Sequence, residues 1–194
     1  MRHDIELEGY AFRLRPISDA DAGLVLNLRC DPELSRFLHG TPPRMSDQLA
    51  WFAAYYERPG DFYFVVERRR DATAEGLIAI YDVDETARVG EWGRWILKRG
   101  SLAAPESAWL IYRCAFEQLA LESVYCRTVA DNAAVVSFHD ACGIKHKRRL
   151  TEHFELRGQR LDAMEHEVDR ESWQEVAPKL AAPARAVARR LDRG

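Results

Sequence analysis

A predicted strand over residues 124–129 leads directly into a short predicted helix. Asp131 or Asn132 is suited to cap this helix at its start, and Gly143 is suited to the left-handed residue that ends it. A strand followed so closely by a helix predicts a mixed α/β domain. The helix carries one imidazole, His139, seven residues after Asn132. We expect this imidazole to face whatever lies beyond the end of the strand.

A second strand and helix are predicted upstream. Residues 91–97 alternate in the manner of a strand, residues 98–104 form a short loop that contains Gly100, and an amphipathic helix extends from about Pro105 to Leu119. Such a loop presents free backbone N–H groups at the positive end of the helix dipole. A pyrophosphate group is therefore its expected ligand.

The remaining segments complete a single mixed domain. In chain order they predict a strand over 10–16, helices from Ser18 to about Arg29, over 33–38 and from Ser46 or Asp47, strands over 62–67 and 76–83, and a closing hairpin over 145–156 and 161–168. The 194 residues, 47% hydrophobic content and net charge of −3 fit one globular domain over residues 1–170. Residues 171–194 are rich in Ala and Arg and predict a helical or frayed tail that is loosely docked.

Composition argues against several classes of function. The basic runs 68–70 and 145–149 are short and are offset by nearby acids, so a nucleic-acid surface is not expected. No apolar run approaches the ~20 residues that span a membrane, and no signal peptide follows Met1, so we expect a cytoplasmic protein with no membrane partner. The four cysteines have no close paired spacing, so neither a metal site nor a disulfide framework is expected.

The spacing of Asn132, His139 and Gly143 resembles the closing motif of the GNAT (Gcn5-related) N-acetyltransferases. That family usually has Asn, a Tyr seven residues later and then Gly-Phe, so His139 stands where many relatives carry the Tyr. The resemblance implies that His139 protonates the departing coenzyme A thiolate. An imidazole with an ordinary pKa near ~6.5 is readily available in its cationic, proton-donating form. The alternative is that His139 is only a half-exposed helix residue.

In GNAT enzymes the loop after the upstream strand resembles Arg/Gln-x-x-Gly-x-Gly/Ala and holds the pyrophosphate of acetyl-CoA. Arg99, Leu102 and Ala104 fall on its three defined positions, with Leu102 where Gly is usual. The resemblance therefore implies that acetyl-CoA is the co-substrate. The implied binding residues are Ile96, Leu97, Lys98, Arg99, Gly100, Ser101, Leu102, Ala103, Ala104 and Asn132.

The resemblance covers residues 10–170 and implies the GNAT fold, a mixed and mostly antiparallel twisted sheet with helices on both faces. Two central strands, residues 91–97 and 124–129, would splay apart and admit the pantetheine arm. Backbone N–H groups of the splayed strand would polarise the thioester carbonyl. Glu91 would take a proton from the amine, because the family often has a carboxylate on this strand. The alternative is that Glu91 faces solvent or pairs with Arg94 or with an arginine of the first helix.

Residues 26–38 resemble the Arg-Asn-x-Pro segment of acetyltransferases that act on nucleotide-linked amino sugars. Such an acceptor would place a phosphate at Arg29 and a base or sugar ring on Trp51, Tyr55 or Tyr56. The alternative is that Arg29 pairs with Asp31 or Glu33 and that Trp51 belongs to the core. The leading expectation is direct acetyl transfer to the primary amine of a nucleotide amino sugar, without a covalent intermediate.

Two other functions fit the same pattern. A peptide N-terminal acetyltransferase of the ribosomal-protein type would want an open groove, whereas a nucleotide sugar would want a pocket with cationic and aromatic walls. A non-catalytic acyl-CoA-binding module would account for Leu102 and for the absence of the usual Tyr. GNAT enzymes are often dimers, so a homodimer is a further expectation from the resemblance.

Overall fold

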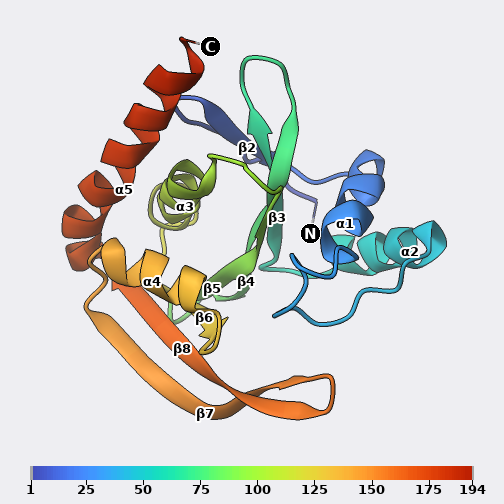
Figure 1. Ribbon diagram of the computed structural model, residues 1–194. Helices are drawn as coiled ribbons and strands as arrows, with labels where there is room; N and C mark the ends of the chain where they lie inside the picture. The colour runs from blue at the N-terminus through green and yellow to red at the C-terminus, as the bar shows by residue number, and fades with distance from the viewer. Residues whose placement is uncertain (1, 194) are drawn as a thin grey trace.

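The computed structural model describes residues 2–193, which form one eight-stranded sheet with helices on both faces (Figure 1). The strand order is β1-β2-β3-β4-β5-β6-β8-β7, and every neighbouring pair is antiparallel except β5 and β6. This arrangement confirms the mixed, mostly antiparallel sheet predicted from the sequence. The strands are β1 (Leu7–Glu8), β2 (Phe12–Pro16), β3 (Phe62–Arg68), β4 (Ala74–Asp84), β5 (Val89–Leu97), β6 (Ser123–Val129), β7 (His146–Leu156) and β8 (Gln159–Asp169).

The helices cover the two faces of the sheet unequally. Helices α1 and α2 lie on one face, and α3, α4 and α5 lie on the other (Figure 1). The helical segments are η1 (Asp19–Asp21), α1 (Ala22–Arg29), α2 (Met45–Tyr56), α3 (Ala104–Arg113), the π-helical turn η2 (Cys114–Gln118), α4 (Ala133–Ala141) and α5 (Arg170–Leu191). Within residues 2–193, none of these helices is both long enough and apolar enough to cross a membrane.

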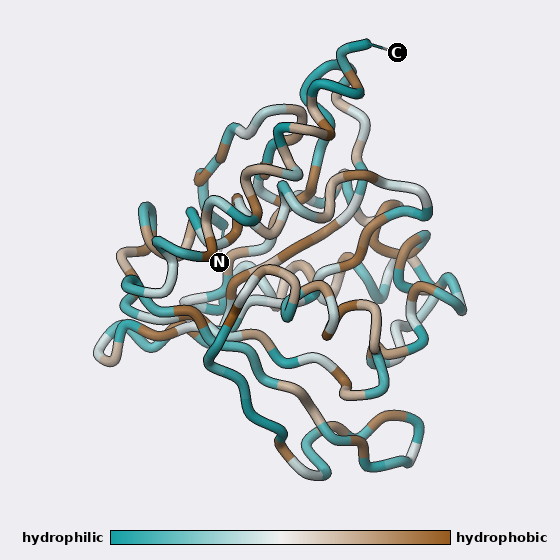
Figure 2. The backbone as a smooth tube through the Cα atoms, turned by 60° about the vertical axis from the view of Figure 1, so that its left-hand side comes forward, coloured by the Kyte–Doolittle hydropathy of each residue, from teal (hydrophilic) through white to brown (hydrophobic). Residues whose placement is uncertain are grey.

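Two hydrophobic cores follow from the alternation of side chains along the central strands. Along β3, Tyr63 and Val65 join the core under α1 and α2, whereas Phe64 and Val66 join the core under α3 and α5. Central strands are therefore apolar on both faces. Figure 2 accordingly shows long hydrophobic stretches in the middle of the molecule and hydrophilic residues near the C-terminal end.

The parallel pair β5 and β6 separates soon after it forms. Only three residue pairs join the two strands, the last of them Glu91 with Tyr125. Beyond Glu91, the residues Arg94 and Trp95 together oppose Ile78 of β4, and Arg94 has a φ of +48°. Such a β-bulge bends its strand. The two central strands thus diverge, as expected, and leave a gap at their carboxyl ends.

Local details differ from the predicted elements at two places. Residues 33–38 form consecutive turns instead of a helix, because so short a segment closes few of the hydrogen bonds that nucleate one. Asn132 stands at the start of α4, but its side chain makes no capping hydrogen bond. Gly143 ends α4 with a φ of +76°, as predicted.

The C-terminal segment is packed more firmly than expected. Helix α5 lies along α3 (Figure 1) and buries Trp173, Val176 and Leu180. The Trp173 ring lies 5.3 Å from that of Tyr112, and Leu180 is 1% exposed. The segment is helical, as expected, but it is not loosely docked, because apolar side chains recur on one face of the helix despite its Ala- and Arg-rich composition.

Candidate active site

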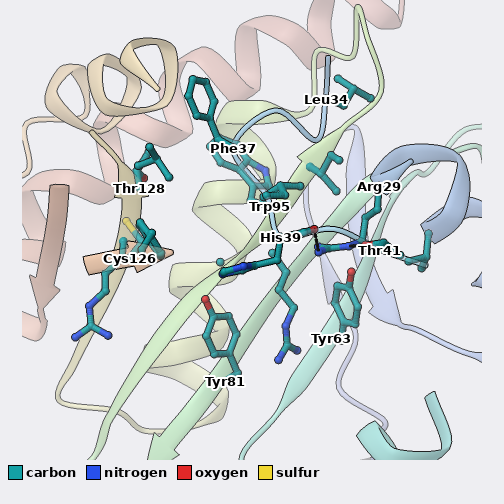
Figure 3. A pocket seen from close by; sticks show the side chains of 18 of the residues that line it. Arg29, Leu34, Phe37, His39, Thr41, Tyr63, Tyr81, Trp95, Cys126 and Thr128 are labelled. Atoms are coloured by element: carbon teal, nitrogen blue, oxygen red, sulfur yellow. Dashed lines mark hydrogen bonds between the residues drawn. The ribbon is translucent and has the colours of Figure 1, made fainter. Parts of the chain in front are cut away.

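A cavity of about 750 Å³ lies where β5 and β6 diverge. One wall comes from α1, α2 and the segment between them, and the other comes from β6, α4 and the β7–β8 hairpin. Figure 3 shows Arg29, Thr41 and Tyr63 on one side, and Cys126 and Thr128 on the other. The predicted site residues that line the cavity are Arg29, Trp51, Glu91, Ile96, Leu97, Asn132 and His139. The predicted loop residues 98–104 lie outside this lining.

Glu91 belongs to the last residue pair before the strands diverge. Its buried carboxylate accepts a hydrogen bond from the Tyr81 hydroxyl at 3.1 Å and another from Arg127 Nη1 at 3.0 Å. Burial raises the pKa of this carboxyl, while the Arg127 charge opposes the rise. Arg94, the partner considered from the sequence, instead binds Asp61 through two hydrogen bonds of 2.6 and 2.9 Å. A proton-accepting role for Glu91 stays a prediction.

His139 is 2% exposed, so the half-exposed helix residue considered from the sequence is not what the structure contains. Its Nε2 lies 3.6 Å from Cys126 Sγ, and its ring packs 5.4 Å from the Trp92 ring. Burial, with a smaller effect from His166, lowers the pKa of His139 to about 3. The expected cation is therefore absent at neutral pH. A role for His139 as proton donor stays a prediction, and it must begin from the neutral imidazole.

Helix α4 lies over a row of side chains on three neighbouring strands. The register sets Cys126 of β6 opposite His166 of β8, and His166 opposite Lys147 of β7. Above this row, His139 meets Cys126, and Asp140 Oδ1 lies 3.2 Å from His166 Nε2 and 2.8 Å from Lys147 Nζ. The row fixes the position of α4 and of the His139 ring.

The loop expected to hold the pyrophosphate connects β5 to α3. Gly100 has a φ of +75°, and the Ser101 hydroxyl accepts a hydrogen bond from the Ala103 amide at 3.2 Å. Arg99 does not point to a free anion site: it forms ion pairs with Asp31 at 2.9 Å and Glu33 at 2.7 Å. Ala104 begins α3, and since Pro105 has no N–H, the first turn offers the amides of Ala104 and Glu106. The free amides and the helix dipole of α3 fit a pyrophosphate. Arg99 would have to break its ion pairs with Asp31 and Glu33 before it could bind the same group.

The diverging strands also suit a pantetheine arm. From Trp92 onward β5 has no ladder partner on the β6 side, and from Cys126 onward β6 has none on the β5 side. Unpaired strand edges offer backbone N–H and C=O groups to a ligand that contains amides. The chain thus supplies a strand-edge slot that ends near the amides of α3. Among residues 2–193, no group of three His, Cys, Asp or Glu side chains could hold a metal ion.

Arg29 and Trp51 lie on the cavity wall formed by α1, α2 and the segment between them, where the acceptor was expected from the sequence. Arg29 donates from Nε to Thr41 Oγ1 at 2.7 Å and from Nη2 to the His39 carbonyl at 3.2 Å. It does not pair with Asp31 or Glu33, which bind Arg99 instead. Trp51 is half-buried, stacks on Tyr55 at a ring distance of 5.6 Å and has the Arg94 guanidinium 5.5 Å from its ring. Binding roles for both residues stay predictions.

Several cavity residues were missed by the sequence analysis. Arg127 and Cys126 are neighbours on β6, so they point to opposite faces: Arg127 reaches Glu91, and Cys126 reaches His139. Alternation along β6 could have predicted these opposite directions. The partners themselves depend on the register and on the path of α4, which no local pattern encodes.

Comparisons with known proteins agree with this geometry. A family model described as an acetyltransferase (GNAT) domain matches residues 12–145. A solved structure from T. thermophilus, described as an acetyltransferase, is 25% identical and has a TM-score of 0.79, with coverage of 94% of this chain and 98% of that chain. No curated protein matches the sequence.

Two further solved structures share the fold at lower identity. Apo FdhC, a nucleotide-linked sugar GNAT, is 24% identical with a TM-score of 0.76 and coverage of 92% of this chain and 98% of that chain. A spermidine N-acetyltransferase from Vibrio cholerae, in complex with CoA and spermine, is 18% identical with a TM-score of 0.76 and coverage of 86% and 99%. Proteins named for different acceptors thus resemble this chain equally well in fold.

The family model spans most of the chain, including β5, α3, β6 and α4, the elements that build the strand-edge slot and carry Glu91 and His139. The chain therefore belongs to the GNAT acetyltransferase family, enzymes that take their acetyl group from acetyl-CoA.

Proposed function

We propose that this acetyltransferase transfers acetyl directly to the primary amine of a negatively charged acceptor, and that the acceptor is an amino sugar on a nucleotide carrier. The observation that carries this proposal is the charge of the cavity wall. Arg29 and Arg58 line the cavity, and within residues 2–193 neither forms an ion pair. Uncompensated guanidinium groups attract phosphate and repel a polyamine.

Aromatic side chains support the same class of acceptor. Trp51 and Tyr63 lie on the same side of the cavity as Arg29, and Tyr81 lies beside Glu91. Flat rings of this kind stack on a nucleobase or on the apolar face of a sugar. A groove that binds a peptide N terminus would not require aromatic rings beside arginines that lack an acidic partner.

In the proposed reaction, Glu91 takes a proton from the acceptor amine, and β5 amides beyond Glu91 donate hydrogen bonds to the thioester oxygen. His139 is the proposed proton donor to the sulfur of coenzyme A. A neutral imidazole that gives its one N–H proton to the sulfur takes up another proton at its second nitrogen, and in this proposal solvent supplies it. The Cys126 thiol, 3.6 Å from Nε2, is not the source, because burial raises its pKa. No covalent enzyme intermediate is included.

An acceptor screen tests the proposal. Release of coenzyme A is measured with acetyl-CoA and, in turn, nucleoside diphosphate amino sugars, spermidine and peptides with free N termini. We expect turnover with the nucleotide sugars. In Arg29→Gln, kcat/KM for the charged acceptor should fall about 10- to 100-fold, which corresponds to the loss of one charged hydrogen bond.

Arg36→Gln is the matched control, because Arg36 is exposed in the turns that follow α1 and does not line the cavity. Acetylation of peptides or spermidine alone would contradict the proposed acceptor class. Binding of acetyl-CoA without turnover of any amine would favour the non-catalytic module. The proposal includes a cytoplasmic homodimer, and sedimentation of the purified protein measures the assembly.

A further inference from the structure

A row of charged side chains crosses four strands and ends at Glu91. From the outside inward, Arg148 Nε lies 2.6 Å from Glu165 Oε1, Arg127 Nε lies 2.9 Å from Glu165 Oε2, and Arg127 Nη1 lies 3.0 Å from Glu91 Oε2. The register places Arg127 of β6 and Arg148 of β7 directly opposite Glu165 of β8. The row therefore follows from strand pairing, and it connects the cavity with the outer edge of the sheet.

Burial changes along this row. Glu91 and Glu165 are 8% and 4% exposed, whereas the outermost side chain, that of Arg148, is 67% exposed. Each buried carboxylate needs a cation or donors to offset its lost hydration. Arg148 and Arg127 both lower the pKa of Glu165, whereas Arg127 is the cation that contacts Glu91, so Arg127 is the guanidinium that the two carboxylates share.

The charged and titratable groups near Glu91 come from four strands. They are Tyr81 and Asp82 of β4, Arg94 of β5, Tyr125, Cys126 and Arg127 of β6, and Glu165 of β8. Burial raises the pKa of Glu91, the Arg127 charge and the Tyr81 hydrogen bond lower it, and Asp82 and Glu165 raise it further. Arg94 is bound to Asp61, so Arg127 is the cation in direct contact with Glu91.

We propose that Arg127 is a positioning residue that keeps Glu91 in its carboxylate form for the proton transfer, and that Glu165 sets how much of the Arg127 charge Glu91 receives. The inference rests on the proposed function of Glu91. In that step an N–H bond of the acceptor ammonium breaks, an O–H bond forms on Glu91, and the proton then passes to solvent. Because the two carboxylates share one guanidinium, Arg127 and Glu165 have opposite effects on the base.

The pH profile of kcat/KM tests this opposition. In Arg127→Met, Glu91 loses its cation, so the acid limb of the profile should move to higher pH by about one unit, a tenfold loss of rate on that limb. In Glu165→Gln, Arg127 is released to Glu91 alone, so the limb should move to lower pH. Arg127→Lys should restore part of the wild-type profile. Arg149→Gln is the matched control and should leave the limb in place, because Arg149 is an exposed arginine of β7 that pairs with Asp162 and not with Glu165.

The inference would be overturned if the acid limb moved in the same direction in Arg127→Met and Glu165→Gln. It would also be overturned if kcat fell while the acid limb kept its position, because a row with a purely structural role does not change the pKa of Glu91. If Arg127→Met does not fold, the position of the acid limb is compared between Arg127→Lys and Glu165→Gln instead. Carbon NMR of glutamate-labelled protein reads the Glu91 carboxyl directly, without an acceptor, with Glu91→Gln as the assignment control.

Glu91→Gln separates the two possible failures. If this variant keeps full activity and the wild-type limb, Glu91 is not the base and the proposed function loses that residue. If it abolishes the limb while the NMR titration of Glu91 is the same in Arg127→Met as in the wild type, only the role of Arg127 is wrong.

Discussion

At the scale of single residues, the environment of His139 decides which protonation states are open to it. The ring lies among Trp92, Trp95 and Phe138, with ring distances of 5.4, 6.3 and 5.5 Å. No anion contacts it directly within the described residues 2–193, so burial dominates. An unfolded chain, by contrast, has an imidazole with its ordinary affinity for protons.

This difference links stability to pH. The folded pKa of His139 is about 3, against an unfolded value of 6.5, so the unfolded state binds more protons below pH 6.5. Stability should therefore fall as the pH decreases from 6.5 toward 3. Between pH 7 and pH 5 the loss from this residue should be roughly 2 kcal/mol. Denaturant unfolding of the wild type and of His139→Phe at both pH values measures it.

His139→Phe keeps an apolar ring in the pocket and removes the titrating imidazole. The variant should therefore lose roughly 2 kcal/mol less stability than the wild type between pH 7 and pH 5. His166 is also buried and its ring lies 5.0 Å from that of His139, so the same comparison in a His166→Phe background separates its contribution. An equal loss in both proteins would mean that His139 carries a proton in the folded state.

At the scale of elements, the start of α3 is the position where charge should matter most to the acetyl donor. Ala104 opens the helix, and its half-buried methyl group lies beside the first-turn amides. A carboxylate there would repel a pyrophosphate and occupy the same donors. Ala104→Glu should weaken acetyl-CoA binding by at least about tenfold, or ~1.4 kcal/mol, in a calorimetric titration.

Ala104→Gln is the control, because it adds the same bulk without the charge. A loss of affinity in the Gln variant equal to that in the Glu variant would point to steric exclusion. Unchanged binding in both would place the pyrophosphate away from α3.

Elements that carry their own boundary signals were predictable from the sequence. Helix α4 has Asn132 before it and Gly143 after it, and both signals are local. Helix α5 was underestimated because Pro178 and Pro183 and many Ala and Arg residues hide an apolar stripe at Trp173, Val176, Leu180 and Ala184. The pairing of Arg127 with Glu91 was not predictable, because it joins residues 36 positions apart through a strand register.

At the scale of the whole molecule, α5 closes one of the two cores. Leu180 is 1% exposed between α5 and α3, so Leu180→Ala should leave a cavity and lower the free energy of unfolding by about 2–5 kcal/mol. Arg189→Ala, at an exposed position of the same helix, should change it by less than about 0.5 kcal/mol. Chemical denaturation measures both, and equal effects would mean that α5 does not stabilise the domain.

The cavity takes one wall from residues 25–63 and its remaining walls from residues 81–156. The residues proposed to select the amine and the residues proposed to act on the thioester thus lie in separate stretches of the sequence. Substitutions in the first stretch can alter acceptor preference over generations while the second stretch is inherited unchanged. On this proposal, the two parts of the cavity can change independently of each other.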